Sequence, residues 1–326
     1  MENTVREILH NYPIHFDRIV TLKSEKIWEI NAQEGSFILK ALPYPKEETD
    51  FIIGAMKHLQ AENFTHFNAV LPTLNYKDTL AHSGQFFFLT KTIEGREASF
   101  INEEDAPNLG EFLAHFHKAT RGYHPQAPYP GRIKWGNWDK MIENKKIDLI
   151  NFQETSPKKG DFNRIFRRFV PYYLEEANIA QDYFKTTEYM EICREEEKSG
   201  GFCHHDLAHH NFIINETPNL IDFDYVLADI RCHDIANILC KILKMNHWDI
   251  KIAFATLVAY DKASALKKAE IPILKAMLRF PQDFWQCGFA RYEENDATSR
   301  NEKKLRHWVK ERTLRKEALE KLETMF

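Results

Sequence analysis

The chain has 326 residues, of which 43% are hydrophobic and 13% aromatic. This is enough apolar material for two lobes with their own cores, and it excludes a disordered chain. The 44 basic and 48 acidic residues give a formal net charge of −4, so the charge balance favours neither nucleic acid nor an anionic membrane as a partner. Five scattered cysteines indicate reduced thiols. The absence of a long apolar run or signal peptide predicts a cytoplasmic protein without membrane contact.

The N-terminal part of the chain has the pattern of a small β-rich lobe. The expected elements are a short helix at residues 5–9 and strands at 19–22, 26–31 and 36–41, with Gly35 in the last turn. Lys40 closes the third apolar run, so its stem is expected to be buried and its ammonium to point in one direction. A lysine that snorkels to the surface at a strand end would have the same pattern.

A helix is predicted at residues 46–63, because its apolar residues recur at helical spacing. An acidic residue on this helix could pair with Lys40 and fix its direction. Glu48 is the first candidate, ahead of Glu47 and Asp50. The helix dipole offers another explanation for all three, since it favours acidic residues in any first turn.

The turn between the first two strands, at residues 23–26, contains no glycine. Loops that bind phosphate commonly contain glycine, because it lets backbone N–H groups approach the anion closely. Ser24 and Lys26 could contact phosphate through their side chains, or they could form only a polar turn.

The remaining sequence is typical of a larger, mainly helical lobe. A buried strand at residues 85–92 leaves the first lobe, and residues 93–95 mark the crossover. Helices are predicted at residues 105–120, from near His233, and over 300–326, the last with an amphipathic pattern. Residues 123–136 are rich in proline, glycine and aromatics and are predicted to form a loop.

The most informative residues lie in a predicted hairpin, with strands at 211–215 and 220–223 and a turn at 216–219. The hairpin would bring Asn211 near Asp222, and Asp206 lies on the loop that leads into it. Phosphoryl transfer from a nucleotide needs a carboxylate near the attacking hydroxyl and oxygen ligands for a divalent metal. Asp206, Asn211 and Asp222 could supply all three groups.

The same region contains four histidines, which could instead bind a transition metal. They are His204, His205, His209 and His210. No cysteine or carboxylate cluster completes a zinc pattern around them. Phosphoryl transfer is therefore the favoured interpretation.

The pattern His204-x-Asp206-x4-Asn211, followed by Ile221-Asp222-Phe223, resembles the catalytic and metal-binding motifs of the aminoglycoside phosphotransferase and choline kinase group. These are small-molecule relatives of protein kinases. More narrowly, the chain resembles the CotS-type spore coat proteins of endospore-forming bacteria. That resemblance rests on residues 86–90, 93–97, 113–119, 222–225, 229–236 and 280–285.

The resemblance implies an α+β fold of two lobes, like that of protein kinases. Residues 1–92 would form the nucleotide-binding lobe, and residues 93–326 the catalytic and acceptor-binding lobe. The implied cofactors are ATP and Mg²⁺. Asp206 would be catalytic, Asn211 and Asp222 would bind metal, Lys40 would hold the phosphates, and the adenine would lie against Thr90, Lys91 and Thr92.

Two functions are compatible with these observations. The first is an ATP- and Mg²⁺-dependent phosphotransferase for an unknown, small hydroxylated acceptor, located in the cytoplasm or incorporated into the spore coat. The second is a kinase-like structural protein with weak or no activity, which contacts other coat proteins. The short connection after Asp222 leaves little room for a protein-kinase activation loop, which favours a small acceptor. Asp224 could approach the metal or serve only as a hydrogen-bonding residue.

Overall fold

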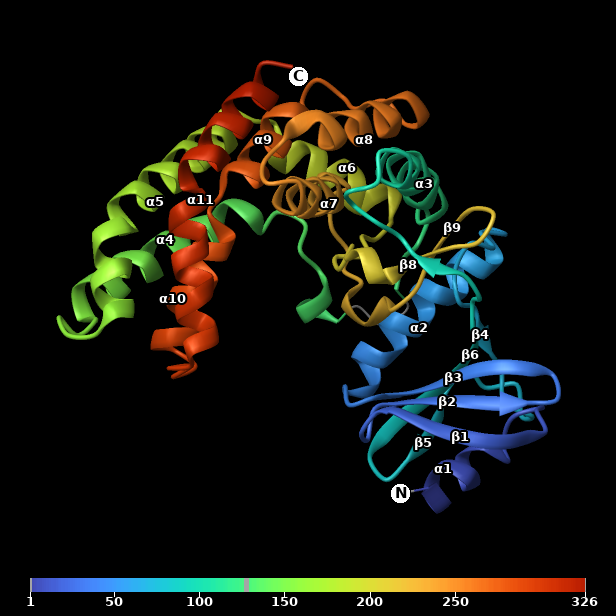
Figure 1. The fold of residues 1–326 in the computed structure, drawn as a ribbon. Helices are drawn as coiled ribbons and strands as arrows, with labels where there is room; N and C mark the ends of the chain where they lie inside the picture. The colour runs from blue at the N-terminus through green and yellow to red at the C-terminus, as the bar shows by residue number, and fades with distance from the viewer. Residues whose placement is uncertain (1, 126–128, 326) are drawn as a thin grey trace. The chain divides into compact units, whose positions relative to one another are not determined.

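The computed structural model describes residues 2–125 and 129–325, so part of the predicted loop at 123–136 lies outside the described residues. The fold is mixed α and β, as expected, with an antiparallel sheet near the N-terminus and a mostly helical remainder (Figure 1). The chain divides into two compact units. The first contains residues 1–99, 112–133 and 199–229, and the second contains 100–111, 134–198 and 230–326. The segment from Asp206 to Asp222 therefore belongs to the unit of the N-terminal sheet.

The first unit is built on a six-stranded sheet in the order β1-β2-β3-β6-β4, with β5 also paired to β6. All of its pairings are antiparallel. The three strands predicted at the N-terminus are present, and Gly35 begins the third with a φ of 123°. The strands are β1 (Phe16–Lys23), β2 (Ile27–Ala32), β3 (Gly35–Leu42), β4 (Val70–Leu71), β5 (Leu80–His82) and β6 (Gln85–Lys91).

Two helices complete this part of the first unit. Helix α1 (Glu2–Leu9) lies beside the sheet (Figure 1) and buries Ile8 and Leu9 in a cluster with Trp28 and Leu39. Helix α2 (Lys46–Ala61) corresponds to the helix predicted at 46–63 and buries its apolar stripe as expected. The burial of α1 against apolar strand residues, Leu39 of β3 among them, supplies the core on this side of the sheet.

The predicted hairpin belongs to a small antiparallel sheet in the order β7-β8-β9, with β7 at Arg96–Glu97, β8 at Phe212–Ile214 and β9 at Pro218–Leu220. The predicted hairpin exists, but its turn is shorter than expected, because Pro218 and Asn219 already belong to β9. The returning strand also ends earlier, at Leu220. Asp222 adopts a left-handed conformation, which cannot continue a strand, and Phe223–Tyr225 form a 3₁₀ helix.

The second unit is helical, and none of the helices that the structure describes is long and apolar enough to cross a membrane. All five cysteines are free thiols, as expected. The helix predicted at 105–120 is α3 (Asp105–Ala119), whose residues are shared between the two units. The other helices are α4 (Trp138–Thr155), α5 (Asp161–Lys185), α6 (Tyr189–Ser199), α7 (Cys232–Met245), α8 (Ile250–Ala263), α9 (Glu270–Arg279), α10 (Gln282–Tyr292) and α11 (Ser299–Glu323).

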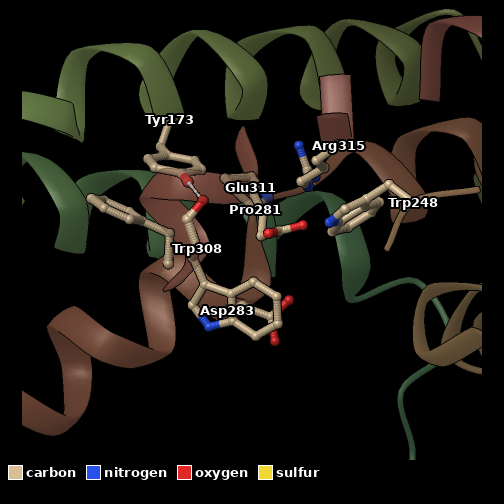
Figure 2. A pocket seen from close by; sticks show the side chains of 8 residues that line it. Tyr173, Trp248, Pro281, Asp283, Trp308, Glu311 and Arg315 are labelled. Carbon is tan, nitrogen blue, oxygen red and sulfur yellow. Dashed lines mark hydrogen bonds between the residues drawn. The ribbon is translucent and has the colours of Figure 1, made fainter. Parts of the chain in front are cut away.

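The C-terminal helix α11 packs on the second unit, as its amphipathic pattern predicts. Leu305 and Leu322 are buried, whereas Leu314 is 47% exposed and does not belong to the apolar face. The hydroxyl of Tyr173 on α5 donates to the carbonyl of Trp308 at 2.8 Å (Figure 2). Arg315 lies nearby in the same view, beside a hollow of about 10 Å³. That hollow offers about the space of one water, so this region is packed core.

Candidate active site

Lys40 is directed by its strand toward two carboxylates that follow β9 in sequence. On β3 it is paired with Ile27 of β2 and Phe88 of β6, so its backbone is fixed on both sides. Its side chain is only 12% exposed. The ammonium nitrogen lies 2.5 Å from Oδ1 of Asp222 and 2.8 Å from Oδ1 of Asp224. The lysine is therefore an internal cation and does not snorkel to the surface.

The charges of this cluster depend on one another. Burial lowers the pKa of Lys40, but the attraction of Asp224 and Asp222 outweighs burial and leaves that pKa above its ordinary value. Burial raises the pKa of Asp224, and the negative charge of Asp222 adds to the rise, although Lys40 opposes it. The ionised form of Asp224 thus depends on a cation nearby.

Asn211 lies between Asp206 and the segment that leads to Asp222. It is buried at the end of the 3₁₀ helix His209–Asn211, and its amide nitrogen donates to the backbone carbonyl of Asp206 at 2.9 Å and to Oδ2 of Asp206 at 3.2 Å. The backbone carbonyl of Asn211 accepts a hydrogen bond from the backbone N–H of Ile221 at 2.9 Å. The hairpin therefore places Asn211 beside Asp206 and next to the residue that precedes Asp222.

The backbone of Asp222 is strained, and His204 supports the residue that precedes it. Its φ of 67° is uncommon for a residue other than glycine. Such conformations often occur at functional sites, where the surrounding structure holds them. The fully buried His204 donates from Nε2 to the carbonyl of Ile221 at 3.1 Å, and its ring packs edge-on against Phe223.

The histidine-rich tract does not converge on one point. His204 is buried against Phe223, whereas Nε2 of His209 lies 4.0 Å from Glu97 and His210 is exposed. Among the described residues, the four histidines do not form a group of three or more that could hold a metal ion, which argues against the transition-metal interpretation of the tract. At least His204 instead serves to support the backbone before Asp222.

Glu48 does not pair with Lys40 in this structure, contrary to the expectation from the sequence. Its Oε1 lies 2.8 Å from both Nε and Nη2 of Arg132. Lys40 is already neutralised by the two aspartates, and the guanidinium offers Glu48 two donors in one plane. Arg132 was missed by the sequence analysis. It lies in a loop rich in proline, glycine and aromatics, where no periodic pattern distinguishes a buried arginine from an exposed one.

The remaining candidate residues lie at the strand ends around β3. Thr90 is buried in β6, and its hydroxyl accepts a hydrogen bond from Asn68 at 3.2 Å. Lys91 is exposed, and the N–H of Thr92 donates to the carbonyl of Ser36 at 2.9 Å. Ser24 is exposed in the turn between β1 and β2. No contact places any of these four side chains on Lys40 within the described residues, so their nucleotide contacts stay predictions.

Comparisons with known proteins identify the family and the fold of the chain. A family model described as "Spore coat putative kinase YutH" matches residues 5–322. Spore coat protein S of Bacillus subtilis (strain 168) is 29% identical over 311 residues, which are 93% of this chain and 88% of that protein. The endospore coat-associated protein YutH of the same organism is 24% identical over 246 residues, which are 74% of this chain and 69% of that protein.

Solved structures share the fold at low sequence identity. An aminoglycoside phosphotransferase from Alicyclobacillus acidocaldarius superposes with a TM-score of 0.86 at 20% identity, covering 98% of this chain and 95% of that one. The amicoumacin kinase hAmiN, in complex with AMP-PNP and Ca²⁺, has a TM-score of 0.67 at 16% identity and covers 98% and 93%. A choline kinase from Cryptosporidium parvum has a TM-score of 0.59 at 12% identity and covers 99% and 98%. The expected kinase-like phosphotransferase fold is confirmed.

Proposed function

Since the chain belongs to the YutH family of spore coat kinase-like proteins, we propose that it is an ATP- and Mg²⁺-dependent phosphotransferase for a small hydroxylated acceptor. The observation that carries this proposal is the convergence of Lys40 with Asp222 and Asp224. The fold is that of small-molecule phosphotransferases. Lobes at 1–92 and 93–326, binding nucleotide and acceptor respectively, are part of the proposal.

The residues present fit a divalent metal ion. Asp222 and Asp224 already enclose a cation, the ammonium of Lys40, and carboxylates are hard oxygen ligands of the kind Mg²⁺ prefers. Asn211 uses its amide nitrogen on Asp206, so its amide oxygen is the atom available to a metal. Asn211 and Asp222 would hold the ion, which when bound would neutralise charge on the phosphates.

The nucleotide would occupy the surroundings of β3. The ammonium of Lys40 would bind phosphate oxygens, and Ser24 would contact them from the turn between β1 and β2. The adenine would lie against Thr90, Lys91 and Thr92. The buried hydroxyl of Thr92 has no hydrogen-bond partner among the described residues, which is the kind of unsatisfied group that a ligand can complete.

Asp206 would act on the acceptor. Its carboxylate is half-buried and oriented by the amide nitrogen of Asn211. It would accept the proton of the acceptor hydroxyl while that oxygen bonds to the γ-phosphorus and the bond to the β-phosphate oxygen breaks, releasing ADP. Positioning and charge stabilisation would supply most of the rate increase, because phosphoryl transfer needs little covalent help from the protein.

A second candidate function is supported by a specific observation. The turn at 23–26 lacks glycine. This suits a kinase-shaped component of the coat with little turnover, which would contact other coat proteins. The coat association named for the relatives fits either function, with the protein made in the cytoplasm and then incorporated into the coat.

Calorimetric titration with ATP, with and without Mg²⁺, tests the proposal. We expect binding that strengthens with Mg²⁺, followed by acceptor-dependent ADP release in a screen of small alcohols and amino alcohols. Binding of ATP without any acceptor-dependent or hydrolytic turnover would favour the structural function. Failure to bind ATP at millimolar Mg²⁺ would contradict the phosphotransferase proposal.

A further inference from the structure

Arg132 joins three segments of the first unit that are distant in sequence. It ends the 3₁₀ helix Pro130–Arg132 and is 5% exposed. Nε and Nη2 contact Glu48 of α2 at 2.8 Å. Nη1 donates to the backbone carbonyls of Asp224 at 2.6 Å and Val226 at 3.1 Å. One side chain thus binds both α2 and the 3₁₀ turn that follows Asp222.

The geometry of these contacts requires an arginine. The planar guanidinium directs donors to opposite sides, so it can bind Glu48 and the two carbonyls at once. The ring of Tyr44 lies 5.2 Å from the guanidinium carbon and covers it. A lysine carries one point charge on a flexible stem and could satisfy either the carboxylate or a carbonyl, but not the whole set.

The 3₁₀ turn that Arg132 binds contains Asp224, whose carboxylate contacts Lys40. Arg132 holds the backbone of Asp224, and Oδ1 of Asp224 lies 2.8 Å from the ammonium of Lys40. We infer that Arg132 is a positioning residue through which Glu48 acts on Lys40. The path runs from Glu48 to Arg132, then through the backbone of Asp224 to its carboxylate and so to Lys40. The consequence for phosphate binding rests on the proposed phosphotransferase function.

This path replaces a direct contact between Glu48 and Lys40. The negative charge of Glu48 compensates the buried guanidinium, and Arg132 then fixes the turn without leaving an unpaired charge. With the turn in place, Lys40 faces two carboxylates rather than Asp222 alone. Loosening Arg132 would release Asp224 and leave Lys40 more exposed and more reactive, although Lys40 and Arg132 share no contact among the described residues.

The first test measures the reactivity of Lys40 in the nucleotide-free protein. Acylation of its amine by a small activated ester is followed by mass spectrometry in wild type, Arg132→Gln, Arg132→Lys and Glu48→Gln, each at the same interval below its melting temperature. We expect Lys40 to react on the order of tenfold faster in Arg132→Gln and several-fold faster in Arg132→Lys. Arg121→Gln, which changes an exposed arginine of the same unit, should leave the rate unchanged.

The acylation rate of a double variant distinguishes a positioning role of Arg132 from a general loosening of the fold. If Glu48 acts through Arg132, the double variant Glu48→Gln/Arg132→Gln should accelerate acylation no more than Arg132→Gln does alone. If Arg132→Gln does not fold, Arg132→Lys and Glu48→Gln still decide the matter. Rates within about twofold of wild type in every folded variant, or fully additive effects, would overturn the inference.

The second test measures ATP affinity at several Mg²⁺ concentrations in the same variants. We expect weaker binding in Mg²⁺ for Arg132→Lys, by on the order of tenfold, with no change for Arg121→Gln. If wild type binds no ATP, the proposed function fails, while faster acylation of Lys40 in the Arg132 variants would still establish the positioning path. If wild type binds ATP and neither readout changes in the variants, the positioning path is wrong and the proposed function stands.

Discussion

The ammonium of Lys40 lies 2.5 Å from a carboxylate oxygen of Asp222, although 182 positions separate the two residues in the chain. Strand β3 of the N-terminal sheet thus contacts the turn that follows the β8–β9 hairpin. The Lys40 side chain is 12% exposed and that of Asp222 is 36% exposed, so burial chiefly penalises the charge of the lysine, which a carboxylate held beside it offsets. In the proposed function, the nucleotide and its metal would bind beside this pair.

Replacing Asp222 with Asn should weaken the binding of ATP in the presence of Mg²⁺ by tenfold or more, on the order of 1.4 kcal/mol. Asn keeps the shape and tolerates the left-handed conformation at this position, so the fold should survive. The measurement is a titration with ATP at fixed free Mg²⁺, alongside a circular dichroism melt. Equal ATP affinity in the variant and wild type would remove Asp222 from the metal site.

Replacing Asp206 with Asn should preserve nucleotide binding and reduce turnover by on the order of 10²-fold, because the proton of the acceptor loses its base. The hydrogen bond from Asn211 can still be accepted by the amide oxygen of the new side chain. Steady-state turnover with an acceptor from the screen measures the effect. Loss of ATP affinity in this variant would place Asp206 in the nucleotide site instead, and unchanged turnover would exclude a role in proton transfer.

Gly110→Ala should destabilise the second unit by about 1–3 kcal/mol through overpacking. A Cβ added at Gly110 of α3 would lie 2.2 Å from the carbonyl oxygen and 3.0 Å from the carbonyl carbon of Thr256 on α8. Both are backbone atoms, which cannot rotate away as a flexible side chain can. Asn108→Ala, on an exposed position of the same helix, is the matched control and should change stability by less than about 0.5 kcal/mol. Urea unfolding compares the two, and equal midpoints would contradict the close approach of α3 and α8.

Lys145 should make stability depend on pH in the alkaline range. Burial lowers its pKa to about 8, although Asp148 opposes the shift. Between that value and the ordinary lysine pKa of about 10.4, the unfolded chain binds more protons than the folded one, so stability rises with pH. The free energy of unfolding of wild type relative to Lys145→Met should therefore increase from pH 8 to 10. If the Lys145 amine keeps an ordinary pKa in the folded protein, the difference in free energy of unfolding between wild type and Lys145→Met should instead stay constant over this range.

Much of the fold and the candidate site was predictable because the signals are local. The strands near the N-terminus alternate with turns, and the spacing from Asp206 to Asn211 falls within one loop and one hairpin. The hairpin prediction erred only at its turn and its end. The left-handed backbone of Asp222 depends on the surrounding packing, which a propensity for strand cannot reveal.

The helices between residues 134 and 199 were not predicted individually. Helix α5 packs against α4, α9 and α11. Its buried residues recur at helical spacing, so its amphipathic pattern was present in the sequence although this helix was not singled out. Helix α11 was predicted, and it buries Leu305, Val309 and Leu322 among many charged residues.

The sequence by itself determined the types of group at the site: a lysine at a strand end, two acidic residues and an asparagine at motif spacing. Only the tertiary structure decided their partners. Glu48 and Arg132 are 84 positions apart, and Glu48 was expected to bind Lys40. Charge pairing between distant segments depends on which donors the packed chain brings within about 3 Å and removes from water. Local spacing encodes neither the approach of these donors nor their burial, because both depend on how the whole unit is folded.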